Sequence, residues 1–231
     1  MEHYFIFNGR SSADFGVWIS GGGTYNAPAR DVSTEVVPGR NGVITFDNGR
    51  FENTQLTYPA FISKRFKTRV DAFRAYLASQ RGYLRLEDTY HPDEFRLAQF
   101  NGGLEVSTTA RNLAGAFDIT FDCKPQRFLK SGETMKAYAS GAVLHNPTHF
   151  DALPVIVCDG NGTITLNGTT ITIADNDGAI CIDCDIQDAY AGDENKNGCI
   201  TSEFPVLSPG DNVLEYDGVT NLQIMPRWWT I

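Results

Sequence analysis

The chain has 231 residues, of which 42% are hydrophobic and 20% are charged. This composition is sufficient to bury a core and excludes a chain that is disordered as a whole. Apolar runs stay below the roughly 18 residues that a membrane-spanning helix needs, and the first residues lack a basic segment followed by an apolar one. We therefore expect neither a membrane span nor a secretion signal.

The net charge of −9 is unevenly distributed. Residues 1–130 contain 16 Lys and Arg against 14 Asp and Glu, whereas residues 131–231 contain 3 against 14. Such a step indicates two units with different surroundings, and we predict domains at 1–131 and 132–231. The acidic second half argues against nucleic-acid binding there, because phosphate contacts need Lys and Arg. A solvated acidic surface that keeps the protein soluble explains the uneven charge equally well.

Period-two alternation dominates the chain and predicts half-buried antiparallel strands. The clearest examples are AFDITFDC at 116–123, TITLNGTTITI at 163–173 and NLQIMP at 221–226. Asn-Gly dipeptides at Asn8, Asn41, Asn48 and Asn167 predict tight turns, because both residues tolerate positive φ. Many short strands separated by frequent turns predict a mainly β fold of sandwiches or barrels.

One segment has helical periodicity instead. Between 66 and 77, Phe66, Val70, Phe73 and Leu77 form a single apolar stripe. With Thr68 as N-cap and Gly82 as the left-handed residue after the last turn, the pattern predicts one helix over about 68–81. We expect this helix to pack on a sheet.

No catalytic or metal-binding motif is recognisable, so we expect neither enzymatic activity nor a cofactor. GxSxG, HExxH and P-loop patterns are absent, and Pro147 prevents a helix that would bring His145 and His149 together. Cys181 and Cys184 resemble half a zinc site, but an offset of three on a strand places them on opposite faces. Buried reduced thiols are the favoured interpretation.

An acidic cluster at 183–193 is a second candidate metal site. Asp183 and Asp185 would share one face of a strand, and with Asp188 or Asp193 they could offer oxygen ligands to Ca²⁺. The spacing does not match an EF-hand loop, so turns and a solvated face are the favoured interpretation, and we predict no metal.

The segment STEVVPGRNGVITFDNGRFENTQLTYPAFI, residues 33–62, contains two turn signals between β-branched and aromatic residues. One interpretation is an ordinary hairpin packed on its own domain. The other is a projecting arm that adds to the sheet edge of a neighbour.

The chain resembles the distal tail protein (Dit) family of siphovirus-type phages, especially those that infect Gram-positive hosts. The first half carries the resemblance through FNGRSSADFGVWI, VPGRNGVITFDNGRFENTQLTYPAFI and VDAFRAYLASQRGYLRLEDTYHPDEFRLAQF. The second half carries it through HNPTHFDALPVIVCDGNGTITLNG, IDCDIQDAY, FPVLSPGDNVLEYDG and the closing PRWW. The resemblance covers nearly the whole chain in the order of the family.

The resemblance implies a tail-tube-like N-terminal β-sandwich or barrel with one helix, followed by a galectin-like or jelly-roll β-sandwich. It implies a homo-hexameric ring, single or in two stacked copies, in the tail tip of the virion, assembled from protein made in the host cytoplasm. The partners would be the tail tube protein, the tail-associated lysin or hub and the tape measure protein, with DNA passing through the channel without specific binding. The family's β-hairpin arm would lie at about 36–61, with Pro38, Arg40, Phe46, Arg50 and Phe51 at a subunit contact. The second half has no room for an inserted carbohydrate-binding module, which weakens any role in receptor recognition.

The main alternative is a carbohydrate-binding β-sandwich that recognises host cell-surface sugars, because jelly-roll domains often bind saccharides. Trp18, Trp228 and Trp229 could supply stacking platforms. A flat row of exposed aromatic side chains would favour this alternative, and buried tryptophans would favour the ring. A glycoside hydrolase would require two facing carboxylates in a cleft.

Overall fold

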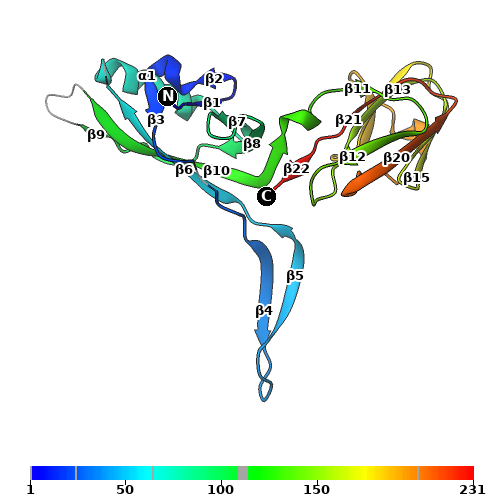
Figure 1. Cartoon of the computed structure of the whole chain (residues 1–231), viewed down its shortest axis with the longest axis horizontal. Coiled ribbons are helices and arrows are strands. Elements are labelled where there is room, and N and C mark those ends of the chain that lie inside the picture. The colour runs from blue at the N-terminus through cyan, green and yellow to red at the C-terminus, as the bar shows by residue number, and fades with distance from the viewer. Residues whose placement is uncertain (1, 24, 64, 109–113, 202) are drawn as a thin grey trace. The chain divides into compact units, whose positions relative to one another are not determined.

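The computed structural model describes residues 2–23, 25–63, 65–108, 114–201 and 203–231. The chain forms two compact units, one of residues 1–127 with Ile231 and one of residues 128–230 (Figure 1). The predicted boundary at 131/132 lies four residues later than this division. The strand that crosses the division continues to Leu129, and the Arg127 guanidinium donates to the Ile231 carbonyl oxygen at 2.7 Å.

The first unit is built on an antiparallel sheet with the strand order β2-β1-β7-β8-β10-β6-β3, with β9 added along β10. The strands are β1 Phe5–Phe7, β2 Arg10–Ser11, β3 Val17–Ile19, β6 Thr54–Ile62, β7 Leu84–Asp88, β8 Glu94–Gln99, β9 Ser107–Thr108 and β10 Gly115–Leu129, and a short 3₁₀ helix η1 spans Ser12–Phe15. The longest pairing joins β6 and β10, from Gly115 opposite Ile62 to Cys123 opposite Thr54. The predicted alternation is confirmed there, since Phe117, Ile119, Phe121 and Cys123 are all buried.

Helix α1 spans Phe66–Ser79, so it begins and ends earlier than the predicted 68–81. The predicted stripe is confirmed, because Phe66, Val70, Phe73 and Leu77 are the buried residues of the helix. The predicted cap is wrong: Arg65 is the N-cap, in a left-handed conformation without a side-chain cap, and the helix ends at a C-cap Gln80.

The earlier start of α1 has a tertiary cause. The Phe66 ring packs against Gly115 on β10, where a Cβ would lie 2.3 Å from the ring. Burial of this ring extends the helix by one half-turn before Thr68. Gly82 does adopt a positive φ of 72°, but it lies beyond the C-cap, in the connection to β7.

The second unit is a sandwich of two antiparallel sheets, with the strand orders β11-β21-β13-β16-β17-β18 and β12-β20-β14-β15-β19. The strands of the first sheet are β11 Lys136–Ala137, β13 Val155–Asp159, β16 Ala179–Asp183, β17 Asp188–Ala191, β18 Glu194–Asn195 and β21 Thr220–Met225. Those of the second are β12 Ala142–Asn146, β14 Gly162–Leu166, β15 Thr169–Ile173, β19 Ile200–Thr201 and β20 Gly210–Asp217, and a last strand β22 covers Trp229–Thr230. Side chains from both sheets form one apolar core.

The Asn-Gly signals at Asn8 and Asn167 act as predicted. Asn8 and Gly9 have φ values of 46° and 75° and join β1 to β2, with Phe7 opposite Arg10. Asn167 and Gly168, at 52° and 86°, join β14 to β15, with Leu166 opposite Thr169. The predicted fold class, mainly β with one helix, is confirmed. No helix in the described part of the chain is long and apolar enough to cross a membrane.

Candidate functional site

Two strands of the first unit stand apart from its large sheet. Within the described ranges, strands β4 (Arg30–Val36) and β5 (Val43–Phe51) pair only with each other, and they leave the sheet as a separate ribbon (Figure 1). We call residues 30–51 the arm. At about 3.3 Å per residue, the seven residues of β4 give a ribbon of roughly 23 Å before the tip.

The arm differs in its limits from the predicted 36–61. Its first strand begins at Arg30, before the predicted start, and the predicted second half belongs to β6 in the large sheet. Leu56, Tyr58 and Ala60 alternate inward on β6 and are buried in the core. Because burial selects the face of a strand, residues 54–62 are held by the core and cannot form part of a projecting hairpin.

One of the two predicted turns in the arm is confirmed and the other is wrong. The tip connects Val36 to its partner Val43, with Gly39 and Gly42 at φ values of 79° and 83°. Asn48-Gly49 instead forms a bulge within β5, where the pairing register shifts opposite residues 30–32. Gly49, at φ 71°, donates its N–H to the Asp47 carboxylate at 2.8 Å, which fixes this bulge.

The base of the arm is fastened by side-chain contacts across the bulge. Arg30 pairs with Asp47 at 2.7 Å, and Arg50 pairs with Asp31 at 2.6 Å. Asn48 also donates to Asp31 at 2.9 Å. The hydrogen bonds from Asn48 and then Arg50 hold the pKa of the Asp31 carboxyl below its ordinary value.

The outer part of the arm exposes apolar side chains on both faces. Val36 is 77% exposed, Val43 54% and Phe46 50%, and Val32, nearer the base, is 45% exposed. Val36 lies opposite Val43, so these two form one apolar pair next to the tip. A two-stranded hairpin without a covering layer is marginally stable in water, and clustered exposed apolar side chains mark interaction surfaces.

The five predicted contact residues occupy three different parts of the arm. Pro38 and Arg40 are exposed in the tip, and Phe46 is exposed in the middle of β5. Arg50 and Phe51 lie at the base, where Arg50 holds Asp31 and the Arg30 guanidinium lies 5.0 Å from the centre of the Phe51 ring. Sequence reasoning missed the Val36–Val43 pair, although valines on both sides of the PGRNG turn were a visible signal.

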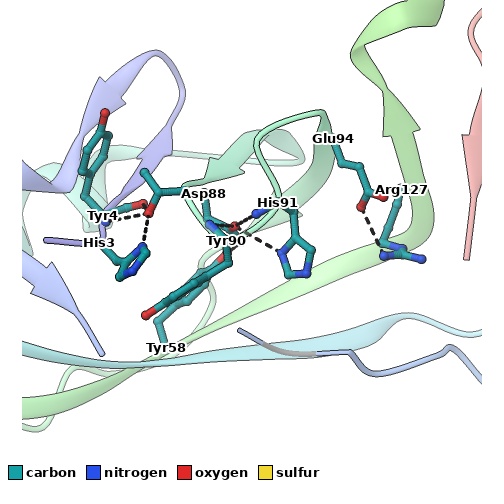
Figure 2. Close-up of polar contacts among 9 residues, drawn as sticks. His3, Tyr4, Tyr58, Asp88, Tyr90, His91, Glu94 and Arg127 are labelled. Carbon is teal, nitrogen blue, oxygen red and sulfur yellow. Dashed lines mark hydrogen bonds and ion pairs between the residues drawn. The ribbon is translucent and has the colours of Figure 1, made fainter. Parts of the chain in front are cut away.

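A second polar cluster surrounds Asp88 at the end of β7 (Figure 2). Its carboxylate accepts hydrogen bonds from the Tyr58 hydroxyl at 2.5 Å and from the backbone N–H groups of Tyr90 and His91 at 2.9 and 2.8 Å. Burial, and then the negative charge of Asp88, raise the pKa of Tyr58 well above its ordinary value. The Tyr58 hydroxyl therefore keeps its proton and donates a hydrogen bond to Asp88. Through Asp88, the turn after β7 is hydrogen-bonded to Tyr58 on β6.

The same region holds the start of the chain. The Thr89 hydroxyl lies 3.0 Å from His3 Nδ1 and accepts from the Tyr4 N–H at 3.2 Å. Nearby, Glu94 accepts from Arg127 at 3.2 Å (Figure 2). These contacts join segments that are distant in sequence. We therefore interpret the cluster around Asp88 as structural, because it holds distant segments of the first unit together.

The acidic cluster of the second unit does not have the predicted geometry. Asp183 is the last residue of β16 and is 6% exposed, whereas Asp185 lies in the turn that follows. The Asp183 carboxylate accepts two hydrogen bonds from Arg227, both at 2.7 Å, and one from the Asp185 N–H at 3.0 Å. Among the described residues, no group of three or more His, Cys, Asp or Glu is placed to hold a metal ion.

The two cysteines of the predicted half-site are in different environments. Cys184 is buried, and burial raises the pKa of its thiol to about 12, whereas Cys181 is half-buried. All five cysteines are free thiols.

The tryptophans do not form a flat row of exposed rings. Trp228 is 7% exposed, Trp229 stacks on Phe150 with ring centres 4.4 Å apart, and Trp18 is half-buried on β3. The exposed large apolar side chains described for the second unit are Val143, Ile186 and Val213, which offer no aromatic platform for a sugar.

Over nearly its whole length, the chain shares its fold with solved phage hub and baseplate proteins. It is similar to the crystal structure of SPP1 Dit (gp 19.1), described as a paradigm of the hub adsorption apparatus in phages that infect Gram-positive hosts. The TM-score is 0.76 at 12% sequence identity, and the match covers 99% of each chain.

Two structures of the phage P2 baseplate in its activated conformation are similar as well. The one with Ca has a TM-score of 0.52 at 11% identity over 97% of each chain, and the one with Sr has 0.50 at 10% over 96%. No family model and no curated protein sequence matches the chain.

Proposed function

We propose that this chain is a structural, non-enzymatic distal tail protein that assembles through its arm into a ring at the tail tip of a long-tailed phage. The observation that carries this proposal is the outer half of the arm, where apolar side chains on both faces lie in solvent. A second copy of the chain is the simplest cover for them. A contact in which the arm of each copy meets a different surface of the next is heterologous, and it closes into a ring when its rotation closes.

The fold shared with SPP1 Dit and with phage P2 baseplate structures supports this role. In the proposal, six copies surround a channel that joins the tail tube to the hub or tail-associated lysin, with the tape measure protein and DNA passing through. The protein is made in the cytoplasm of the host and resides in the virion. The acidic second half would lie on the periphery, where charge more than about 8–10 Å from DNA is largely screened.

The test is a chain with a shortened arm. Ser33 and Phe46 are paired, so replacing residues 34–45 by Asn-Gly closes the arm with a two-residue hairpin turn and keeps the ion pairs at its base. Light scattering should give six times the chain mass of 25.5 kDa for the full chain and the mass of one copy for the shortened chain. Electron microscopy should show rings for the full chain.

The far-ultraviolet circular dichroism of both proteins should be that of a β fold, which controls for misfolding. A full chain that stays monomeric at every concentration would overturn the proposal. Rings formed by the shortened chain would show that the arm is not the assembly element.

A further inference from the structure

The outer face of the first unit's sheet contains an open groove. It has a volume of about 680 Å³, and its lining comes from β6, β10, Ser20 after β3 and the segment from Gly103 to Ser107. The floor lies on the face of β6 and β10 opposite the core, because Pro59, Phe61, Ala116 and Asp118 alternate with buried neighbours.

The groove has an apolar end and an acidic end. Phe61, 40% exposed, lies opposite Ala116, and two residues further along the strands Pro59 lies opposite Asp118. Glu105 also lines the groove, and among the residues that the structure describes, Glu105 and Asp118 are its ionisable groups. The patch at Phe61 is thus followed, after about 7 Å along the strand direction, by the Asp118 carboxylate, and Glu105 gives the groove a second negative charge.

The arm presents the complementary order. The exposed Val36–Val43 pair comes first, and the tip that follows carries a single cation, Arg40. The guanidinium of Arg40 is exposed and can pair with carboxylates on another surface. The arm thus has an apolar pair followed by a cation, and the groove has an apolar patch followed by a carboxylate, so the two surfaces are complementary.

We propose that this groove receives the arm tip of a neighbouring copy, with Val36 and Val43 on Phe61 and with Arg40 between Glu105 and Asp118. This inference rests on the proposed ring and names its acceptor surface. The arm of the same copy is unsuited to the groove. It leaves the sheet just before Thr54, at the other end of β6 from Phe61, about 20 Å away, and runs away from the sheet (Figure 1).

Complementary charge reversal tests the contact in the full chain. The first variant is Arg40→Glu and the second is Glu105→Lys with Asp118→Lys. Each alone places like charges in contact, so sedimentation velocity should show association weakened at least tenfold relative to the wild type. An equimolar mixture should restore association to within about threefold of the wild type, because every contact in a ring of alternating variants has opposite charges.

A matched control carries Asp177→Lys and Asp193→Lys, two exposed acids of the second unit, and should associate like the wild type. Variants that associate normally one by one, or a mixture that does not recover, would overturn the acceptor assignment. If the shortened arm still abolishes assembly in that case, the proposed function stands and only the groove is wrong. A wild-type chain that never associates would overturn both.

Cross-linking gives an independent readout. In chains whose two incompletely buried cysteines are replaced, Cys181→Ser and Cys199→Ser, a variant with Arg40→Cys is mixed with one with Asp118→Cys under a mild added oxidant, which takes the two protons and two electrons released as the disulfide forms. A covalent dimer should form in the mixture and not with either variant alone. Equal yield when Asp177→Cys replaces Asp118→Cys would refute the contact.

Discussion

The Val36–Val43 pair allows a quantitative test of the arm as an assembly element. Replacing both residues by threonine keeps the β-branched shape that the strands require and puts a hydroxyl in place of one methyl on each side chain. Burying a hydroxyl where a methyl would lie costs about 1–2 kcal/mol at a fully covered site. Scaled by exposures of 77% and 54%, the two changes together cost about 2 kcal/mol per subunit contact, which is roughly a thirtyfold weaker association.

The second unit supplies a matched control. Val143 and Val213 also form an exposed cross-strand pair, at 55% and 48% exposure, on a sheet face outside the arm. Sedimentation velocity over a concentration series should show weaker association for the double threonine variant of the arm and no change for Val143→Thr with Val213→Thr. The reasoning is refuted if the arm variant associates as tightly as the wild type, or if both variants weaken association equally.

Four further predictions concern the stability of the two units. Arg227→Met should destabilise the second unit by about 2–3 kcal/mol in urea, because it leaves the buried Asp183 carboxylate without its bidentate partner, and adding Asp183→Asn should recover most of the loss. Burial raises the pKa of Asp183, but the hydrogen bonds from Arg227 and the backbone outweigh it and hold the pKa below 3.8. The stability that the ionised carboxylate contributes is therefore fully present above pH 3.8, and it is lost as the pH falls through the lower pKa of the folded state. Acid unfolding of Arg227→Met should therefore begin at higher pH than that of the wild type, and equal acid midpoints would contradict this account. Phe73→Ala should cost the first unit about 3–5 kcal/mol, because the ring is fully buried in the core, and a loss below 1 kcal/mol in chemical denaturation would count against the packing described. Gly162→Ala should lower the melting temperature of the second unit, since a Cβ there would lie 2.1 Å from the Asp217 carbonyl oxygen, whereas Gly178→Ala, in open space, should not.

Much of the fold could be predicted from local patterns. The alternation in 116–123 and 163–173 placed the correct side chains in the two cores, and the stripe from Phe66 to Leu77 identified the helix face. These predictions hold because a strand or helix with one apolar face has a single way to bury it. The Asn-Gly turns at Asn8 and Asn167 hold because the two strands beside each dipeptide pair directly.

The candidate site depended on contacts that no local pattern contains. Asn48-Gly49 carries the same turn signal as Asn167-Gly168, yet it forms a bulge, because Asp31 from the opposite strand holds Asn48 and Arg50. The Asp183 carboxylate is occupied by a residue 44 positions away, Arg227. Sequence spacing alone therefore suggested a shared acidic face where the folded chain has a buried ion pair.

By itself, the sequence determined that this chain forms two β-rich units with one helix, because periodicity and turn chemistry act over a few residues. Only the tertiary structure decided which strands have a covering layer. From sequence, the arm was predicted at 36–61, which includes most of TQLTYPAFI at 54–62 and almost none of RDVSTEV at 30–36. In the fold, residues 54–62 join the large sheet and bury one face, while residues 30–36 pair only within the arm and bury neither. Burial depends on what packs against a strand, and for the arm the proposed cover is another copy of the chain.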